Sequence, residues 1–382
     1  MAAVQSPLSE LPPYTPFDLG DGLVLRSATE ADAEPLADFN AVVHGGPPET
    51  LDHQAATWTR DLLRGDHPTS SVSDFTIVEQ TESGRIVSSC LLISQTWTYG
   101  GIPFGVGRPE LVGTHPDFRG RGLIRAQFDL LHRRSAERGQ VVQALTGIPN
   151  YYRQFGYEPA LINPAPRIGF PSTIEPLPTD ADDSIAFRLA ATDDLPFIVE
   201  MYERSARRSL IAAVRDEAIW RYELTGRDSG SDYCHDLYVI ETLQRAPVGL
   251  IALPKRLEAG SLISPLVEVG DGIAWFRVAE AILRFVKASG ASLADRDGER
   301  FQQFGFELTP NHPLPRLSAS RLPKVGEPFA WDVRVPDVAA FLRLIAPMLE
   351  TRLTESPVAG YSGELRMTFY RSGLSLAFSE GR

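Results

Sequence analysis

Runs of apolar residues with two different periods divide the chain into expected strands and helices. From Leu123 onward, apolar positions fall three and four residues apart, which predicts a helix closed by Gly139. Shorter runs rich in branched apolar residues predict strands at 23–26, 75–79, 87–94, 141–145 and around 111–114. Strands interrupted by helices in this order predict an α+β fold with a mixed sheet.

The same pattern starts again after a proline-dense stretch. Residues 163–180 carry little helical signal and are interpreted as a linker. Beyond them, residues 185–194 resemble 23–32, and residues 301–307 (FQQFGFE) resemble 152–158 (YRQFGYE). These two echoes predict an internal duplication.

A third, shorter segment follows near residue 323. Residues 337–353 predict an amphipathic helix that Pro347 should kink or split. Residues 363–370 and 374–378 alternate between apolar and polar, so we expect a hairpin whose turn is Ser372-Gly373. One helix and one hairpin are too little for an independent sheet.

Composition narrows the class of protein. The 382 residues and 43% hydrophobic content predict two to three domains with sizeable cores. A net charge of −12 argues against nucleic acid as a partner, and it is compatible either with a cationic substrate or with an ordinary acidic surface. Cys90 and Cys234 lack metal-ligand spacing. No stretch has membrane-spanning length, and we expect a cytoplasmic protein without a metal.

The most informative chemistry precedes the helix that begins at Leu123. A strand, a Pro116-Asp117 break and the run Arg119-Gly120-Arg121-Gly122 lead into this helix. Glycines let a backbone approach a phosphate, and free helix N–H groups favour its negative charge. The turn therefore predicts an anion cradle, with a solvated basic turn as the alternative. It is not a P-loop, because no Gly-Lys-Ser/Thr follows, and it lacks the dinucleotide fingerprint.

A second motif lies one helix and one strand later, where Tyr152 begins the sequence YRQFGY. Together, R-G-R-G-L-I and Y-x-x-x-G-Y resemble the acetyl-CoA site of the GCN5-related N-acetyltransferases (GNAT superfamily) over residues 21–165. Ile124 stands where that family usually has Gly or Ala, and in this respect the loop is similar to the subgroup around the enhanced intracellular survival (Eis) acetyltransferase of mycobacteria.

The resemblance implies an acyltransferase fold with a mixed, splayed sheet. It also implies acetyl-CoA as co-substrate and assigns roles to residues. Tyr152 would be the general acid. The residues implied to bind acetyl-CoA are Val112, Gly113, Thr114, Arg119, Gly120, Arg121, Gly122, Leu123, Ile124 and Arg125. Among the arginines, Arg121 and its neighbours are expected to neutralise pyrophosphate, while Arg125 lines a solvated helix face.

The resemblance also implies an organisation of the chain. It comprises a tail at 1–20, a catalytic domain at 21–165, a linker at 166–182, a degenerate GNAT-like domain at 183–322 and a sterol-carrier-like segment at 323–382. In the second copy, Phe301 is expected at the place of Tyr152, and Asp271 faces any phosphate. The last segment is shorter than in the relatives, which use a C-terminal carboxylate as base, so that role is not transferred to Arg382. The relatives also suggest a homo-oligomer.

Acetyl transfer to an amine needs an acid, a base and an oxyanion donor. A lysine-like amine with a pKa of about 10.4 is neutral in only about one molecule in a thousand near pH 7, which adds roughly 4 kcal/mol to the barrier unless a base helps. Backbone N–H groups near residues 112–114 are expected to hold the oxyanion. Tyr151 and Tyr157 compete with Tyr152 as the acid. For the base, the possibilities that stay open are Glu110, His115 and His44.

Two functions follow from these residues. The first is an N-acetyltransferase acting on a primary amine of a small molecule or peptide. The second is a non-catalytic module that binds acyl-CoA or lipid, consistent with a degenerate second copy. The intact Tyr152 favours the enzyme.

Overall fold

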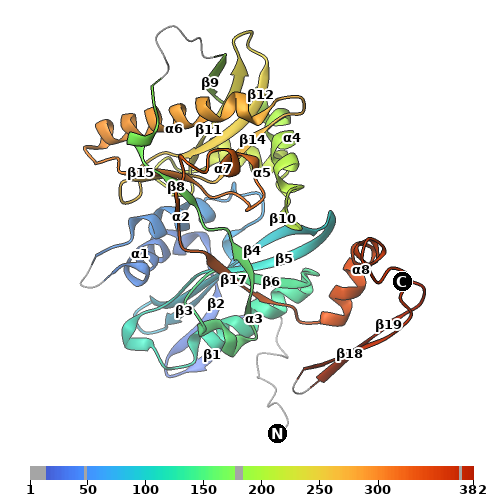
Figure 1. The fold of residues 1–382 in the computed structure, drawn as a ribbon. Helices are drawn as coiled ribbons and strands as arrows, with labels where there is room; N and C mark the ends of the chain where they lie inside the picture. The colour runs from blue at the N-terminus through green and yellow to red at the C-terminus, as the bar shows by residue number, and fades with distance from the viewer. Residues whose placement is uncertain (1–13, 47–49, 177–183, 370–371) are drawn as a thin grey trace.

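The computed structural model describes residues 14–46, 50–176, 184–369 and 372–382 (Figure 1). Its largest sheet, called here the N-terminal sheet, has the order β1-β2-β3-β4-β5-β6-β17-β7, and β10 pairs with β4. Its strands are β1 (Phe17–Gly20), β2 (Leu23–Ser27), β3 (Phe75–Gln80), β4 (Arg85–Tyr99), β5 (Ile102–Thr114), β6 (Val142–Leu145), β7 (Glu158–Asn163), β10 (Ile211–Ala213) and β17 (Phe329–Arg334). The strands predicted in this region are confirmed.

Helices cover both faces of the N-terminal sheet. On one face lie α1 (Ala33–His44) and α2 (His53–Leu63), and on the other lies α3 (Leu123–Glu137). Alternation along β4 produces this layering, because Leu91 packs with the α1–α2 core while Leu92 packs with α3. The sequence pattern did not predict α2. Its start is fixed by Asp52, whose carboxylate accepts hydrogen bonds from two backbone N–H groups of the first turn.

The central part of the chain forms a second layered unit. The central sheet has the order β14-β12-β11-β9. Its strands are β9 (Ile185–Leu189), β11 (His235–Thr242), β12 (Pro247–Pro254) and β14 (Leu266–Val269). One face packs against α4 (Leu195–Ala206) and α5 (Glu217–Arg221), and the other against α6 (Trp275–Asp297). The layering of the N-terminal sheet is thus repeated.

The two sheets also share a partly buried ion-pair pattern. Arg26 on β2 binds both carboxylate oxygens of Asp32 at 2.8 Å, and it pairs with Glu79 on the adjacent β3. On β9, Arg188 binds the two oxygens of Asp194 at 2.7 and 2.8 Å and pairs with Glu241 on the adjacent β11. In both units, the arginine fixes the same strand–turn–helix junction.

Two short strands cross between the units. A third sheet has the order β13-β15-β8-β16, from β13 (Ser261–Ser264), β15 (Gln303–Phe306), β8 (Arg167–Gly169) and β16 (Lys324–Val325). In it β8, which comes from the predicted linker, lies between β15 and β16. Conversely, β17 from the C-terminal part lies between β6 and β7 of the N-terminal sheet. The interpretation of 163–180 as a plain linker is therefore wrong at β8.

The topology also corrects the expected place of Phe301. The N-terminal unit runs α3–β6, then the 3₁₀ helix η5 (Tyr151–Phe155), then β7. The second unit runs α6–β15, then α7 (Pro313–Leu317), then β16. Phe301 therefore precedes the strand that corresponds to β6, whereas Tyr152 follows β6. The similar sequences of 301–307 and 152–158 therefore do not occupy equivalent positions in the two units.

The C-terminal part is an arm. Helix α8 (Val338–Thr354) packs through Phe341 on Phe104 and Tyr99, with ring centroids 5.4 and 6.5 Å apart. The helix is continuous through Pro347, so the predicted split is wrong, because proline removes only one backbone donor.

The hairpin of β18 (Gly363–Phe369) and β19 (Ser372–Phe378) extends from α8 (Figure 1). Ser372 pairs with Phe369 and Gly373 pairs with Thr368, so both residues lie in the β18–β19 ladder and the turn predicted at Ser372-Gly373 is wrong. Over the part of the chain that the structure describes, no helix is long and apolar enough to cross a membrane.

Candidate functional site

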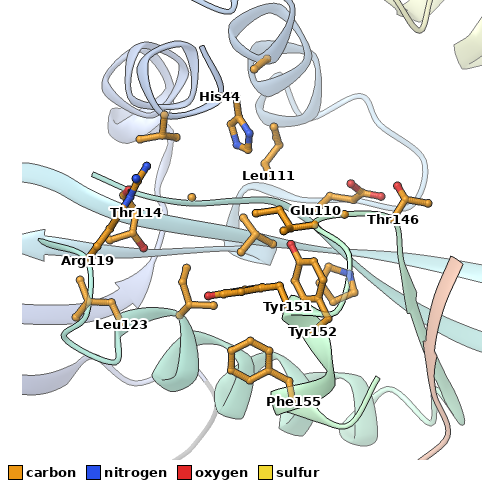
Figure 2. Close-up of a pocket in the computed structure, with 18 of the residues that line it drawn as sticks. His44, Glu110, Leu111, Thr114, Arg119, Leu123, Thr146, Tyr151, Tyr152 and Phe155 are labelled. Atoms are coloured by element: carbon orange, nitrogen blue, oxygen red, sulfur yellow. The ribbon is translucent and has the colours of Figure 1, made fainter. Parts of the chain in front are cut away.

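A cavity of about 1060 Å³ lies beside the C-terminal part of β5. β5 pairs in parallel with β6 only through Val106 and Gly107 in the described register, so residues beyond this point diverge from β6. The cavity is bordered by β5, the turn before α3, η5 and the start of α2 (Figure 2). This divergence confirms the predicted splayed sheet and leaves strand backbone accessible to a ligand.

The turn predicted as an anion cradle borders the cavity. Gly120 and Gly122 have φ of +77° and +75°, and no atom lies within 4 Å of a Cβ built on either residue. Gly122 is the N-cap of α3, so the first N–H groups of this helix face the turn. The predicted coenzyme-binding residues that line the cavity are Val112, Gly113, Thr114, Arg119, Gly120, Gly122, Leu123, Ile124 and Arg125.

The three arginines near the cradle differ in their places. Arg121 does not line the cavity, and its guanidinium lies 4.9 Å from the Phe118 ring centroid. Arg125 does line it, over the Phe155 ring at 5.2 Å. Arg119 also lines it, and its Nε donates to the Thr114 carbonyl at 3.3 Å. The positive charge beside the cradle thus comes from Arg119 and Arg125.

A β-bulge shapes the wall formed by β5. The pairing register shifts between Ser89 and Leu91, so that Leu111 and Val112 stand opposite the single residue Cys90. Leu111 has a φ of +49°, an uncommon conformation for a branched residue. A bulge leaves one residue outside the ladder and re-aims its neighbours. The backbone here is therefore turned toward the cavity by the fold.

Buried polar side chains hold the bulge. The Ser89 hydroxyl lies 3.2 Å from the Leu111 carbonyl oxygen and 2.9 Å from Asn40 Oδ1. Asn40 Nδ2 donates to Thr59 Oγ1 on α2 at 2.9 Å, and all three polar side chains are fully buried. This chain connects α1, α2 and β4 to one carbonyl of the bulge, so the positive φ is stabilised by contacts from distant elements.

Tyr152 lines the cavity, and its ring packs against α3. It is 6% exposed, and its ring centroid lies 5.9 Å from that of Phe128 on α3. Burial raises the pKa of Tyr152 well above its usual range, so the phenol stays protonated at neutral pH. Tyr151, which is half-buried, also lines the cavity (Figure 2). Tyr157 is fully buried, and its hydroxyl lies 3.0 Å from His132 Nε2, which removes it as a competitor.

Two of the three possible bases face the cavity. Glu110 lines it, and burial raises the pKa of this carboxyl, although Arg108 pairs with it. His44 also lines it, and burial lowers the pKa of its imidazole, so it is neutral at pH 7. His115 does not line the cavity, and its Nδ1 accepts a hydrogen bond from the Asp117 N–H at 3.3 Å.

Sequence reasoning missed the wall opposite the cradle. Trp58 on α2 and Tyr233 from the central unit both line the cavity, with ring centroids 4.5 Å apart. The Asp232 N–H donates to Gln54 Oε1 at 2.9 Å, which docks this loop on α2. Asp52 and Asp232 add carboxylates to the lining. The sequence feature that could have indicated this wall is Asp52, a helix-capping residue at the start of α2. No feature of the sequence around Tyr233 indicates that it contacts α2.

The C-terminal arm does not contribute to this cavity. Of the described residues, none beyond Tyr233 lines it, and Arg382 ends the chain beside the β18–β19 hairpin (Figure 1). Nor do the described residues contain a cluster of three His, Cys, Asp or Glu side chains able to hold a metal ion.

Comparison with known proteins agrees with this geometry. Residues 24–160 match the family model described as an acetyltransferase (GNAT) domain. No curated protein sequence matches the chain. The matched segment contains β5, the cradle, α3 and Tyr152, so the N-terminal unit is similar in sequence to GNAT acetyltransferase domains.

Solved structures extend the likeness beyond that segment. A GCN5-related N-acetyltransferase from Anabaena variabilis has a TM-score of 0.62 at 15% identity, over 94% of this chain and 84% of that one. A probable N-acyltransferase from Enterococcus faecalis has a TM-score of 0.60 at 15% identity, over 84% and 74%. Saccharomyces cerevisiae N-myristoyltransferase with bound myristoyl-CoA has a TM-score of 0.57 at 12% identity, over 84% of each chain. The fold is that of the GNAT acyltransferases.

Proposed function

We propose that the protein is an N-acetyltransferase that transfers acetyl from acetyl-CoA to a primary amine of a small molecule or peptide. The observation that carries this proposal is the single cavity that brings together the glycine cradle, the bulged β5 backbone and the Tyr152 phenol. Each supplies one requirement of acyl transfer from a thioester: anion binding, oxyanion stabilisation and proton donation.

The cradle is the expected site of the coenzyme pyrophosphate. Gly120 and Gly122 leave open space at the N-terminus of α3, where free N–H groups and the helix dipole favour negative charge. Arg119 and Arg125 flank it. The pantetheine arm of acetyl-CoA would then lie along the exposed backbone of Val112 and Thr114, where β5 diverges from β6.

The bulge is the expected oxyanion site. During attack, the acetyl carbonyl oxygen gains negative charge, and a fixed backbone N–H stabilises it without reorganisation. Leu111 and Val112 lie outside the regular ladder at the cavity wall, so their N–H groups are the proposed donors.

Proton transfer completes the mechanism. The amine attacks in its neutral form, the C–S bond breaks, and the leaving thiolate takes a proton from Tyr152, whose elevated pKa keeps this proton available. Before the attack, the bound ammonium loses one proton to Glu110 or His44, both of which line the cavity. After the C–N bond forms, the nitrogen loses a second proton, which restores the Tyr152 phenol. The carboxylates of Asp52 and Asp232 favour a positively charged acceptor at the opposite wall.

The organisation of the rest of the chain is a second part of the proposal. The repeated arginine–carboxylate pattern and the repeated layering support a degenerate GNAT-like copy at 183–322. In it, Asp271 stands in the loop before α6 and pairs with Arg204 Nη1 at 2.6 Å, where a phosphate would otherwise bind. Helix α8 with its hairpin supports a sterol-carrier-like segment at 323–382, as in the Eis-like subgroup.

The test uses the full chain, because β17 completes the N-terminal sheet. The protein is incubated with acetyl-CoA and a panel of amines, and products are identified by mass spectrometry. Donors with acyl chains up to myristoyl-CoA are run in parallel. We expect transfer from acetyl-CoA to at least one amine, with Tyr152→Phe lowering kcat about 100- to 10,000-fold and barely changing acetyl-CoA affinity.

Two controls make this test decisive. Tyr157→Phe removes a hydroxyl that faces His132 instead of the cavity, so its kcat should stay near wild type. Near-normal kcat in Tyr152→Phe would assign the acid role elsewhere, with Tyr151 the next residue to change. Tight acetyl-CoA binding with no transfer to any amine would support the non-catalytic acyl-CoA-binding alternative.

A further inference from the structure

A second, smaller cavity lies in the central unit. Its volume is about 190 Å³, and it is bordered by α4, the segment 215–227 and strands β11 and β12. Tyr233 borders both cavities. Its ring centroid lies 4.5 Å from that of Trp58 in the large cavity and 6.0 Å from the Arg227 guanidinium in the small one. The Tyr233 side chain therefore belongs to the walls of both cavities.

Two side chains that border the small cavity, Trp220 and Arg227, carry buried hydrogen-bond donors that lack a partner among the described residues. Trp220 is 2% exposed, and its Nε1 has no hydrogen-bond partner among the described residues. Arg227 binds Glu223 through Nε and Nη2 at 2.7 and 2.8 Å, which leaves its buried Nη1 without a partner in the same part of the chain. A buried donor left without a hydrogen bond lowers stability, so an acceptor in this cavity is favourable.

A third donor group completes this lining. The Arg215 guanidinium lies over the rings of Tyr202 and Trp220, at 5.4 and 5.3 Å from their centroids. Among the described residues, no ion pair within 4.0 Å engages this guanidinium, and Glu223 acts on it only from a longer distance. Stacking orients a guanidinium but leaves its N–H edge able to bind an anion.

The remaining charged groups leave a positive excess. Glu223 is the one carboxylate that lines the cavity, and Arg227 occupies both of its oxygens. His235 donates from Nδ1 to the Tyr233 carbonyl oxygen at 3.0 Å, and burial lowers the pKa of its imidazole, so it is neutral at pH 7. Two guanidinium groups therefore face one carboxylate.

The backbone here is also unusual. Residues Tyr222–Gly226 form a turn of π-helix directly after α5, and this turn carries Glu223. Single π-helical turns occur frequently at functional sites, because they displace side chains from the regular helical positions. The opposite wall is apolar, from Leu237 and Leu266.

We propose that this cavity binds a small organic carboxylate. Its charged group would accept hydrogen bonds from Arg215, Arg227 and Trp220, and its short apolar or aromatic body would pack against Leu237 and Leu266. The carboxylate belongs either to a free small molecule or to the far end of an acyl acceptor that passes Tyr233. The site does not depend on the acetyl-transfer reaction.

Binding to the full-length protein is measured by calorimetry with three probes of similar shape: benzoate, benzyl alcohol and benzylamine. We expect saturable binding of benzoate only. Arg215→Gln and Trp220→Phe should each weaken benzoate binding about tenfold, since each removes one donor while keeping most of the packing. Arg221→Gln is the matched control, because Arg221 is exposed on the same helix and pairs with Glu217 at 2.6 Å. It should bind benzoate as the wild type does.

Several outcomes would overturn the site. One is equal binding of benzyl alcohol and benzoate, and another is unchanged benzoate affinity in folded Arg215→Gln and Trp220→Phe. A third is the absence of saturable benzoate binding, which would mean that the cavity holds water only. Thermal melts establish that each variant is folded. If the protein acetylates amines, a carboxylate-bearing amine and its methyl ester separate the two sources. If the acceptor itself fills the site, benzoate raises the KM of the carboxylate-bearing amine and leaves the KM of its methyl ester unchanged.

Discussion

Gly122→Asp tests the proposed pyrophosphate site most directly. Gly122 has a φ of +75° at the N-terminus of α3, and a Cβ there would meet no atom within 4 Å. The substitution therefore costs only the left-handed backbone conformation, about 1 kcal/mol, which Asp tolerates better than most residues. Attraction between the new carboxylate and the helix dipole offsets about 0.3–1 kcal/mol of this. We expect the fold to survive.

The effect on acetyl-CoA should be much larger than the effect on stability. A carboxylate about 5 Å from one phosphate charge is repelled by roughly 1 kcal/mol at the dielectric constant of water and by about 3 kcal/mol at an effective value of 20. The cradle is open to solvent on one side, so the repulsion falls between these limits. This corresponds to a roughly 5- to 150-fold increase in the Kd of acetyl-CoA.

The matched control is Gly122→Asn, which has the same backbone cost and nearly the same size without the charge. Calorimetry of both variants with acetyl-CoA isolates the charge as the ratio of their Kd values. This ratio should fall when salt is raised from 0.1 to 1 M, because the screening length drops from about 10 to about 3 Å. Equal Kd values for the two variants at low salt would refute the placement of the pyrophosphate at this cradle.

Three further predictions follow from named contacts. Gly147→Ala would place a Cβ 2.4 Å from the Tyr152 ring and so displace the phenol. We expect kcat to fall at least tenfold in steady-state kinetics, while calorimetry shows the acetyl-CoA affinity retained. An unchanged kcat would contradict the role of Tyr152 as the acid. Ser89→Ala removes the hydroxyl beside the Leu111 carbonyl of the bulge. We expect the free energy of unfolding in urea melts to fall by about 1–3 kcal/mol, and kcat to fall more than the acetyl-CoA affinity. An unaffected kcat would mean that the bulge does not position the reacting groups. Burial lowers the pKa of His132 to about 3 and of His312 to about 4, so below pH 6.5 the unfolded chain binds protons that the folded chain does not. Each should therefore lower stability by up to about 1.4 kcal/mol per pH unit between pH 6.5 and 4, and urea melts that do not change from pH 7.5 to 5 would contradict this.

The cradle, the helix after it and the Tyr152 segment could be predicted from the sequence, because each depends on residues adjacent in the chain. Glycine at Gly120 and Gly122 permits the left-handed turn wherever the chain goes next. Apolar spacing after Leu123 defines the buried face of α3, and nine of the ten predicted coenzyme-binding residues line the cavity. Local chemistry was sufficient for this half of the site.

The opposite half was decided by tertiary structure. Trp58 and Tyr233 are far apart in sequence and meet only because the central unit docks on α2. The exchange of β8 and β17 joins strands whose partners are likewise distant, and a three-residue strand has no strong pattern of its own. Leu111 adopts a positive φ that its side chain disfavours, and buried bonds from α1, α2 and β4 stabilise it. Long-range packing overrides local preference where its many contacts outweigh the cost of a strained backbone conformation, which is about 1–3 kcal/mol. These contacts join residues distant in the sequence, so no local sequence pattern predicts them.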